Sequence, residues 1–463
     1  MYIIHRTPAE ILLKKYLKNT NMVIRFLNTG LSLALCAVAA GAPPIAGQPA
    51  FRVVSHMNNL DQPAGIVQGS PDVFYSEAGQ SGPHVALSIT AEGSQTALAT
   101  VLSPGQIPSL LVSAANGRFY SSIEQGAQLA HVFSVTSAPG SQKIYPAQSL
   151  HPILTQNLPD GDLLAMAVSP AQTLWSLAKV DLNGAVTSIY RFSAGERPAA
   201  AIYASDGNYY GVSQAANATG YVYRVTPSGV LTKLYDFPAN TFRGYFAVPL
   251  LEAGDGNLYG ATPHGGANGT GAIYRIALDG RYALLYSFPE GKLGGPTALI
   301  EGSDGNLYGA TIGSLRNGGY SQLFRIAKTG QFSVVYDMSD ARADGACQCS
   351  LVQGSDGIVY GTAIGGGKYG GGLYFALDAG QPKPAPRPQR FNPQTGAAGT
   401  KVSIWGSHLL SASVRFNGTA ATVVSNSGSN YIWATLPPGA TSGPITVTTP
   451  GGTVATQASF IVR

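Results

Sequence analysis

A short motif recurs seven times along this 463-residue chain at an almost constant spacing. Its clearest copies read Asp-Gly-Asn-Leu-Tyr-Gly at residues 255–260 and 304–309, and the other copies keep the order of turn residues followed by large apolar residues. Successive copies are 45, 44, 46, 49, 49 and 52 residues apart, counted between the anchor positions Tyr75, Tyr120, Leu164, Tyr210, Tyr259, Tyr308 and Tyr360. A period of this length marks an array in which each copy is one supersecondary unit.

Within one unit, four short apolar segments alternate with turn signals. In the sixth unit the expected strands are Thr297–Gly302, Asn306–Ile312, Ser321–Ile326 and Phe332–Met338. Asp-Gly between two apolar runs favours a tight hairpin turn, and adjacent residues of a strand point to opposite faces. Since both faces of each small sheet carry large apolar side chains, every sheet needs a neighbour on each side. Seven such units predict an all-β fold, a seven-bladed β-propeller.

The two ends of the repeat region complement each other. The last unit stops after its third strand, Gly372–Leu377, and has no fourth strand of its own. Near the N-terminus, Phe51–Met57 matches the fourth strand of the sixth unit, Phe332–Met338, at four identical residues. We therefore expect this N-terminal strand to complete the last blade and close the ring, which would remove an open sheet edge.

The fifth unit carries the most complete pattern: Asp255–Gly260, Gly265-Gly266, Tyr274-Arg275-Ile276 and Tyr286-Ser287-Phe288. This pattern resembles the GloVer-type (Gloeo/Verruco) tandem repeat of bacterial secreted proteins, and the resemblance extends over residues 51–380. The first three units are degenerate copies. The resemblance implies an extracytoplasmic bacterial protein, and it assigns neither a defined activity nor a catalytic residue. With the residues before it, we take 48–380 as the propeller domain.

A proline-rich segment follows the repeats at residues 381–390 and predicts an extended polyproline II linker. The last segment, 391–463, suits a small immunoglobulin-like β-sandwich. Its expected strands are Lys401–Trp405, Ser413–Phe416, Thr422–Ser425, Tyr431–Leu436, Ile445–Thr449 and Ala458–Val462. It resembles the IPT/TIG domain in the stretches Phe391–Gly396, Gly399–Gly406, Val414–Gly418, Leu436–Gly439 and Ala458–Phe460. The resemblance implies a surface spacer or a protein-interaction module.

Residues 1–47 read as a leader that contains a signal peptide. From Met22, a basic start precedes the apolar run Leu31–Ala40, and small residues follow it. This run is shorter than the roughly 20 residues that cross a bilayer, so we expect a secreted or surface-associated protein without a transmembrane segment. Of the net charge of +5, residues 1–42 contribute +4 through five Lys and Arg against one Glu. The nearly neutral remainder argues against a nucleic-acid partner.

Motifs that carry chemistry are absent from the sequence. It contains no His-Glu-x-x-His, P-loop or Gly-x-Ser-x-Gly motif, and its histidines are scattered. We interpret Cys347 and Cys349 as loop cysteines, with a local disulfide or part of a metal site as alternatives. No cofactor and no metal is therefore expected.

Two sets of charged residues recur with the repeat. Four aspartates fit turn formation, with calcium binding or acid/base catalysis as the alternative; they are Asp206, Asp255, Asp304 and Asp356. Four third-strand cations fit solubility of the sheet edges and ion pairs between blades, with recognition of an anionic glycan as the alternative; they are Lys179, Arg224, Arg275 and Arg325.

The expected ligand site is the mouth of the central channel, where Arg243, Tyr245 and Phe246 combine a cation with aromatic faces. The sequence thus favours a noncatalytic binding protein whose propeller is a platform for an extracellular glycan or a surface protein. The IPT/TIG-like domain would serve as spacer or contact module. The alternative is an extracellular carbohydrate-active enzyme, a lyase or glycosidase, with two carboxylates at the channel mouth.

Overall fold

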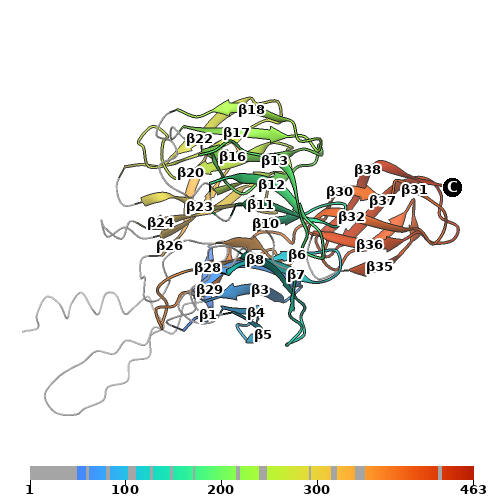
Figure 1. The fold of residues 1–463 in the computed structure, drawn as a ribbon. Coiled ribbons are helices and arrows are strands. Elements are labelled where there is room, and N and C mark those ends of the chain that lie inside the picture. Colours follow the sequence, from blue (N-terminus) through green and yellow to red (C-terminus); the bar gives the residue numbers. More distant parts are fainter. Residues whose placement is uncertain are drawn as a thin grey trace, which may run out of the picture. The chain divides into compact units, whose positions relative to one another are not determined.

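The computed structural model describes residues 49–463 except for 59–61, 80–83, 103–110, 126–128, 146–149, 170, 172, 215–218, 239–247, 291–292, 314–320, 339–349 and 426–429. Residues 49–463 form one compact unit. Every regular element in the described part is a β-strand (Figure 1). The expected all-β class is therefore confirmed.

Seven sheets follow one another along the described part of residues 50–378, and we number them in chain order. Sheet 1 contains β2 (Pro63–Ser70), β3 (Val73–Ala78), β4 (His84–Thr90) and β5 (Gln95–Leu102). Sheet 2 contains β6 (Val112–Ser113), β7 (Phe119–Gln125), β8 (Leu129–Val135) and β9 (Lys143–Ile144). Sheet 3 contains β10 (His151–Asn157), β11 (Leu163–Val168), β12 (Trp175–Val180) and β13 (Val186–Arg191).

The next sheets repeat this antiparallel order, although the first strand of sheet 4 is split in two. Sheet 4 contains β14 (Arg197–Pro198), β15 (Ile202–Tyr203), β16 (Tyr209–Gln214), β17 (Gly220–Val225) and β18 (Leu231–Asp236). Sheet 5 contains β19 (Val248–Glu252), β20 (Leu258–Thr262), β21 (Ala272–Ile276) and β22 (Tyr282–Ser287). Sheet 6 contains β23 (Leu293–Glu301), β24 (Leu307–Gly313), β25 (Ser321–Ile326) and β26 (Phe332–Met338).

Sheet 7 is completed by the N-terminal strand, as expected. Its own strands are β27 (Leu351–Gln353), β28 (Val359–Ala363) and β29 (Leu373–Asp378), and β1 (Ala50–His56) pairs antiparallel with β29 (Figure 1). The first strands of successive sheets contact one another in the order β2, β6, β10, β15, β19, β23 and β27, and β27 contacts β2 again. The sheets therefore form a closed ring around these first strands.

The repeated aspartates form the turns that join first and second strands. Asp255 accepts the backbone N–H of Asn257 at 3.1 Å and the hydroxyl of Tyr259 at 2.6 Å, and Asp304 accepts those of Asn306 and Tyr308 at 3.1 and 2.9 Å. Burial alone would raise the pKa of Asp255, but these hydrogen bonds outweigh it and hold that pKa below its ordinary value. The turn interpretation of these aspartates is confirmed.

The glycine that follows the repeated tyrosine makes room for an aromatic ring on the third strand. Gly260 faces Tyr274 across the sheet, and Gly309 faces Phe324. A Cβ atom at Gly309 would lie 2.8 Å from Cε1 of Phe324 and 2.6 Å from the Ala298 carbonyl oxygen. Between the sheets, these aromatic side chains build the core, with Tyr274, Phe324 and their neighbours fully buried. The motif therefore encodes both a turn and a packing position.

The C-terminal residues form two sheets of their own. One has the order β30 (Arg387–Asn392), β32 (Lys401–Ser407), β36 (Tyr431–Thr435) and β35 (Thr422–Ser425). The other has the order β31 (Thr395–Gly396), β38 (Gly452–Val462), β37 (Gly443–Thr449), β33 (Ser413–Phe416) and β34 (Thr419–Ala420). A separate apolar core of thirteen buried residues, among them Ile404 and Phe460, lies between them. The expected β-sandwich is therefore present.

One strand of this sandwich was missed by the sequence analysis. The predicted linker, 381–390, contains the start of β30, which pairs with β32 at the edge of its sheet. Pro388 fits this position because a proline lacks the N–H that a central strand needs, and an edge strand tolerates that loss. The alternating prolines therefore predicted a linker, although the last residues of this segment form part of an edge strand.

Candidate functional site

Polar side chains at the ends of first strands tie neighbouring sheets together. Each accepts a hydrogen bond from a backbone N–H in the turn of the sheet that precedes its own around the ring. Gln68 accepts from Ser355 at 3.0 Å, and Gln353 accepts from Ser303 at 3.0 Å. Glu301 accepts from Gly254 at 2.8 Å, and Glu252 accepts from Ser205 at 2.9 Å. We call these four residues the strand-end ring. Sequence reasoning missed it, although three of its members stand three residues before a repeated aspartate.

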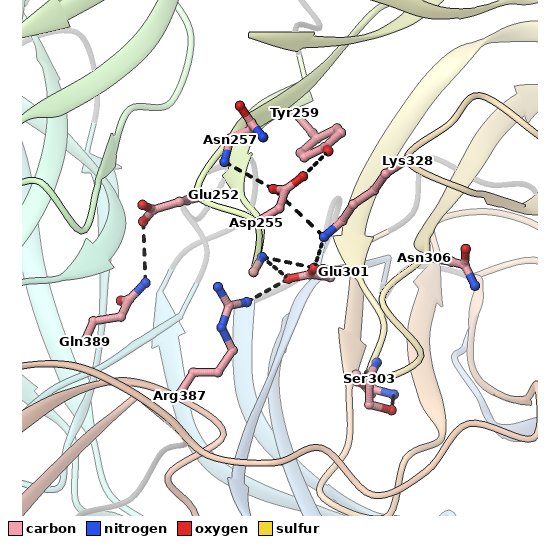
Figure 2. A network of polar contacts seen from close by, with 12 residues as sticks. Glu252, Asp255, Asn257, Tyr259, Glu301, Ser303, Asn306, Lys328, Arg387 and Gln389 are labelled. Atoms are coloured by element: carbon pink, nitrogen blue, oxygen red, sulfur yellow. Dashed lines mark hydrogen bonds and ion pairs between the residues drawn. The ribbon is translucent and has the colours of Figure 1, made fainter. Parts of the chain in front are cut away.

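Glu301, a member of the strand-end ring, binds two cations (Figure 2). Besides the Gly254 N–H, its carboxylate accepts Nζ of Lys328 at 2.6 Å and Nη1 of Arg387 at 2.7 Å. Only 12% of its side chain is exposed, so these contacts are poorly screened by water. Lys328 also lies 3.9 Å from the carboxylate of Asp255 in sheet 5. A cation of the C-terminal segment thus completes a charge cluster of the propeller.

The C-terminal segment continues across the propeller from sheet to sheet. The amide of Gln353 in sheet 7 donates to Gln381 at 2.8 Å, and Arg387 binds Glu301 of sheet 6. Arg390 donates to the Ser205 carbonyl of sheet 4 at 2.7 and 3.2 Å. These residues of the predicted spacer therefore bind the propeller instead of standing off from it.

Two tryptophans of the sandwich extend this contact. Nε1 of Trp405 donates to the Asn157 carbonyl of sheet 3 at 3.2 Å, and Nε1 of Trp433 donates to the Ala115 carbonyl of sheet 2 at 3.4 Å. Trp405 is buried, and its ring meets that of Tyr203 edge-on at 5.7 Å. Tryptophan suits such a contact because a large apolar body and one N–H are both satisfied there.

A cleft of about 1060 Å³ lies between sheets 3 to 5 and the C-terminal domain. One wall contains Asp160, Lys179 and Tyr203, and the opposite wall contains Asn392 and Gln457. Tyr209, Glu252, Gln389 and Arg390 also line the cleft. Concave sites in which a few polar groups converge beside aromatic rings are the usual form of ligand sites.

The charges along this cleft are largely paired. Lys179 forms an ion pair with Asp160 in sheet 3, so the ion-pair interpretation of this third-strand cation holds within one sheet instead of between blades. Burial raises the pKa of the neighbouring Asp162, and the Asp160 charge adds to this effect. Gln389 reaches Glu252 at 3.4 Å. Hydrogen-bonding groups of both kinds therefore line the cleft without a large net charge.

Several residues singled out from the sequence lie outside the described part of the chain. Arg243, Tyr245 and Phe246, between β18 and β19, belong to this group, and so do Cys347 and Cys349. The site predicted at Arg243, Tyr245 and Phe246 thus stays a prediction. Among the described residues, no group of three or more His, Cys, Asp or Glu side chains is placed to hold a metal ion. Within the same ranges, no helix has the length and apolarity needed to span a membrane.

A buried acid in sheet 1 is expected to make the stability of the ring depend on pH. Glu77 is 2% exposed, and burial raises its pKa to about 8, against a smaller opposing effect of Ser121 in sheet 2. Between 4.5 and about 8 the folded chain retains this proton while the unfolded chain releases it, so the free energy of unfolding should fall as pH rises.

Replacing Glu77 by Gln tests this pH dependence. We expect the folding constant of the parent chain to fall by up to about tenfold per pH unit in that window, and the Glu77→Gln chain to lack this component. Urea unfolding at several pH values measures both slopes. Equal slopes in the two chains would contradict the assignment.

Comparison with known proteins supports the two parts of the chain separately. Residues 157–375 match the Gloeobacter/Verrucomicrobia repeat, and residues 386–461 match the IPT/TIG domain. The first match begins in the third unit, in keeping with the degenerate sequence of the earlier copies. No curated protein matches the chain.

Solved structures resemble the fold at low sequence identity. A streptogramin B lyase shares 18% identity, with a TM-score of 0.53 over 71% of this chain and 97% of its own. A catalytically inactive virginiamycin B lyase from Staphylococcus aureus, determined with quinupristin, shares 15% with a TM-score of 0.53, over 71% and 99%. A lectin from Burkholderia pseudomallei shares 13% with a TM-score of 0.52, over 72% and 96%. At these identities the likeness concerns the fold alone.

Proposed function

We propose that this chain, which joins a Gloeobacter/Verrucomicrobia repeat region to an IPT/TIG domain, is a noncatalytic extracytoplasmic binding protein. Both parts fit a binding or interaction protein. In our proposal the ligand is a short segment of an extracellular glycan, held in the cleft between sheets 3 to 5 and the IPT/TIG domain. The observation that carries the proposal is the cleft itself, whose walls come from both parts of the chain.

The lining supports a glycan better than an ionic ligand. Asn392, Gln457 and Gln389 supply amide donors and acceptors, and Asp160 with Lys179 supplies a charge-neutral pair. Sugar hydroxyls both donate and accept hydrogen bonds, so a lining of mixed polarity matches them. The volume of about 1060 Å³ lies just above the ordinary range for small-molecule sites, which suits an oligosaccharide.

The contacts of the C-terminal domain support a rigid cleft. Arg387, Arg390 and Trp405 each bind a different sheet. A wall held at several points loses little freedom when a ligand binds, and this preorganisation favours affinity. The IPT/TIG domain then acts as a contact module that forms half of the site.

The test is binding of the purified chain to a glycan array and to a polysaccharide panel. The blocking variant is Gln457→Trp, because Gln457 is exposed and lines the cleft; the matched control is Ser459→Trp, exposed on the same strand but not among the lining residues. We expect saturable binding by the parent chain and the control. The blocking variant should bind at least about tenfold more weakly, a loss of about 1.4 kcal/mol.

Other outcomes would overturn specific parts of the proposal. If both tryptophan variants bind equally well and the Arg243→Ala and Tyr245→Ala variants lose glycan binding, the ligand binds at the segment predicted from the sequence and not in the cleft. Release of reducing sugars or unsaturated products from the panel would establish the enzymatic alternative. Absence of binding by the parent chain would exclude a glycan ligand.

A further inference from the structure

Two glycine-rich loops, in sheets 5 and 7, share one backbone frame. They join the second and third strands at residues 265–271 and 366–372, and each is closed by a parallel bridge, Gly265 with Thr270 and Gly366 with Gly371. Left-handed φ values recur at matching glycines: 81°, 70°, 72° and 109° in the first loop, and 75°, 70°, 78° and 94° in the second. Because other residues rarely adopt such values, this frame is set by its glycines and does not depend on the residues at the tip.

The two loops differ at the tip. In sheet 5 the tip is Ala267-Asn268, and the Asn268 amide turns inward and donates to the Phe288 carbonyl at 2.9 Å. In sheet 7 the tip is Lys368-Tyr369, and 47% of Tyr369 is exposed. Among the large apolar side chains that stay exposed in the described ranges, Tyr369 is the one aromatic. The same backbone conformation thus carries an exposed tyrosine ring in sheet 7 and an asparagine amide that is hydrogen-bonded within the protein in sheet 5.

A histidine and a cation flank the exposed ring. The Lys368 backbone N–H donates to Nδ1 of His56 at 3.2 Å. Because Nδ1 accepts this bond, the ring N–H lies at Nε2, where it can donate to a ligand. The His56 ring stands perpendicular to the Tyr369 ring at 6.2 Å, and Nζ of Lys368 lies 5.0 Å from the Tyr369 centroid. We call His56, Lys368 and Tyr369 the tip platform.

The tip platform lies away from the cleft. Strand β28 leaves the turn at Asp356-Gly357 and reaches the glycine loop at its other end, whereas the strand-end ring and the cleft are on the turn side. No residue of the platform lines the cleft. A ligand at the platform would therefore be a second and separate occupant.

We propose that the tip platform binds a uronate residue of an acidic polysaccharide. The exposed tyrosine ring offers a flat apolar face to the C–H groups of a pyranose, as aromatic side chains do in amphipathic contacts. Lys368 offers a point charge to the sugar carboxylate, and His56 offers an N–H donor to a hydroxyl. The matching loop of sheet 5 lacks all three groups, so the backbone frame alone does not account for the platform.

The test exchanges the tip of one loop for that of the other. Lys368→Ala with Tyr369→Asn gives sheet 7 the tip of sheet 5 within an unchanged glycine frame, so folding should be preserved, as equal melting temperatures would show. Titration with polygalacturonate, and with dextran as the neutral polymer, measures binding. We expect the full chain to bind polygalacturonate and the exchanged variant to bind it at least about tenfold more weakly. The variant Ser459→Trp, which lies outside both the cleft lining and the tip platform, should bind polygalacturonate as the parent chain does.

Two single variants sharpen the assignment. Lys368→Ala should lower the affinity for polygalacturonate and remove its salt dependence, whereas Tyr369→Phe should retain binding because the ring face remains. Polygalacturonate binding that survives the exchange, or that is absent from the parent chain, would overturn the proposal. Equal binding of dextran would overturn the assignment to a uronate. These outcomes are independent of the cleft, so a failure here and a failure of the proposed function are distinguishable.

Discussion

Removal of β1 is expected to abolish the native fold of sheet 7 and to open the ring. β29 would lose one of its two partners, and Phe51 would no longer stack on Tyr336 at 4.0 Å or contact Phe375 at 5.4 Å. The lost strand contributes a full ladder of backbone hydrogen bonds together with these apolar contacts. Because domains are stable by only about 5–15 kcal/mol, a loss on this scale consumes most of that margin. We expect the shortened chain to aggregate or to unfold without a cooperative transition.

Milder changes in β1 separate a specific effect from general damage. Phe51→Ala should lower the free energy of unfolding by about 2 kcal/mol, below the range for fully buried phenylalanines because Phe51 is half-buried. Arg52→Ala, an exposed change on the same strand that removes one solvent-exposed hydrogen bond to the Ala91 carbonyl, should cost no more than about 1 kcal/mol. Urea unfolding followed by fluorescence measures both. A peptide of residues 50–56 added to the shortened chain should restore cooperativity; a shortened chain that unfolds like the parent would show that β1 does not close the ring.

Gly309→Ala is expected to destabilise sheet 6 although it adds a single methyl group. The new Cβ atom would overlap the ring of Phe324 and the Ala298 carbonyl, which are both held by the strands on either side. Overpacking of this kind costs about 1–3 kcal/mol, and we expect the upper end because the Ala298 oxygen belongs to the backbone. The chain itself shows the alternative solution in sheet 3, where Ala165 faces Ala178.

A double-mutant cycle tests that explanation. Removing the ring with Phe324→Ala creates a cavity that the methyl group added by Gly309→Ala partly fills, so the two changes together should cost less than the sum of the single changes by about 1 kcal/mol or more. Thermal and urea unfolding of the four chains gives the coupling. Strict additivity would mean that Gly309 is required for a reason other than the facing ring.

The repeat motif carries most of the fold because its interactions are local. Asp255 meets Asn257 and Tyr259 within four residues, and the same holds for Asp304 with Asn306 and Tyr308. Such contacts depend on spacing along the chain, so a repeated spacing predicts a repeated structure. The closing strand β1 was predictable for a related reason, because Phe51–Met57 repeats the apolar pattern of β26.

The candidate site depends on contacts between residues that are far apart in the sequence. Trp405 reaches the Asn157 carbonyl, and Arg390 reaches Ser205, across 248 and 185 positions. No spacing rule connects such residues, and the prolines at 381–390 read as a free linker. The cleft exists only because the C-terminal domain docks on sheets 2 to 6, so its lining could not be read from either part alone.

The sequence by itself therefore determined the all-β class, the repeated sheets, the strand that closes the ring and the sandwich that follows it. Each of these rests on a local pattern of turn residues and apolar alternation. The tertiary structure decided that the C-terminal domain lines a cleft together with the propeller and that Glu301 of sheet 6 binds both Gly254 of sheet 5 and Arg387. It also decided that Tyr369 is exposed whereas the Asn268 amide is hydrogen-bonded to Phe288. These features depend on how separate segments pack against each other, because the direction of a side chain in the packed structure determines whether that side chain is buried or exposed.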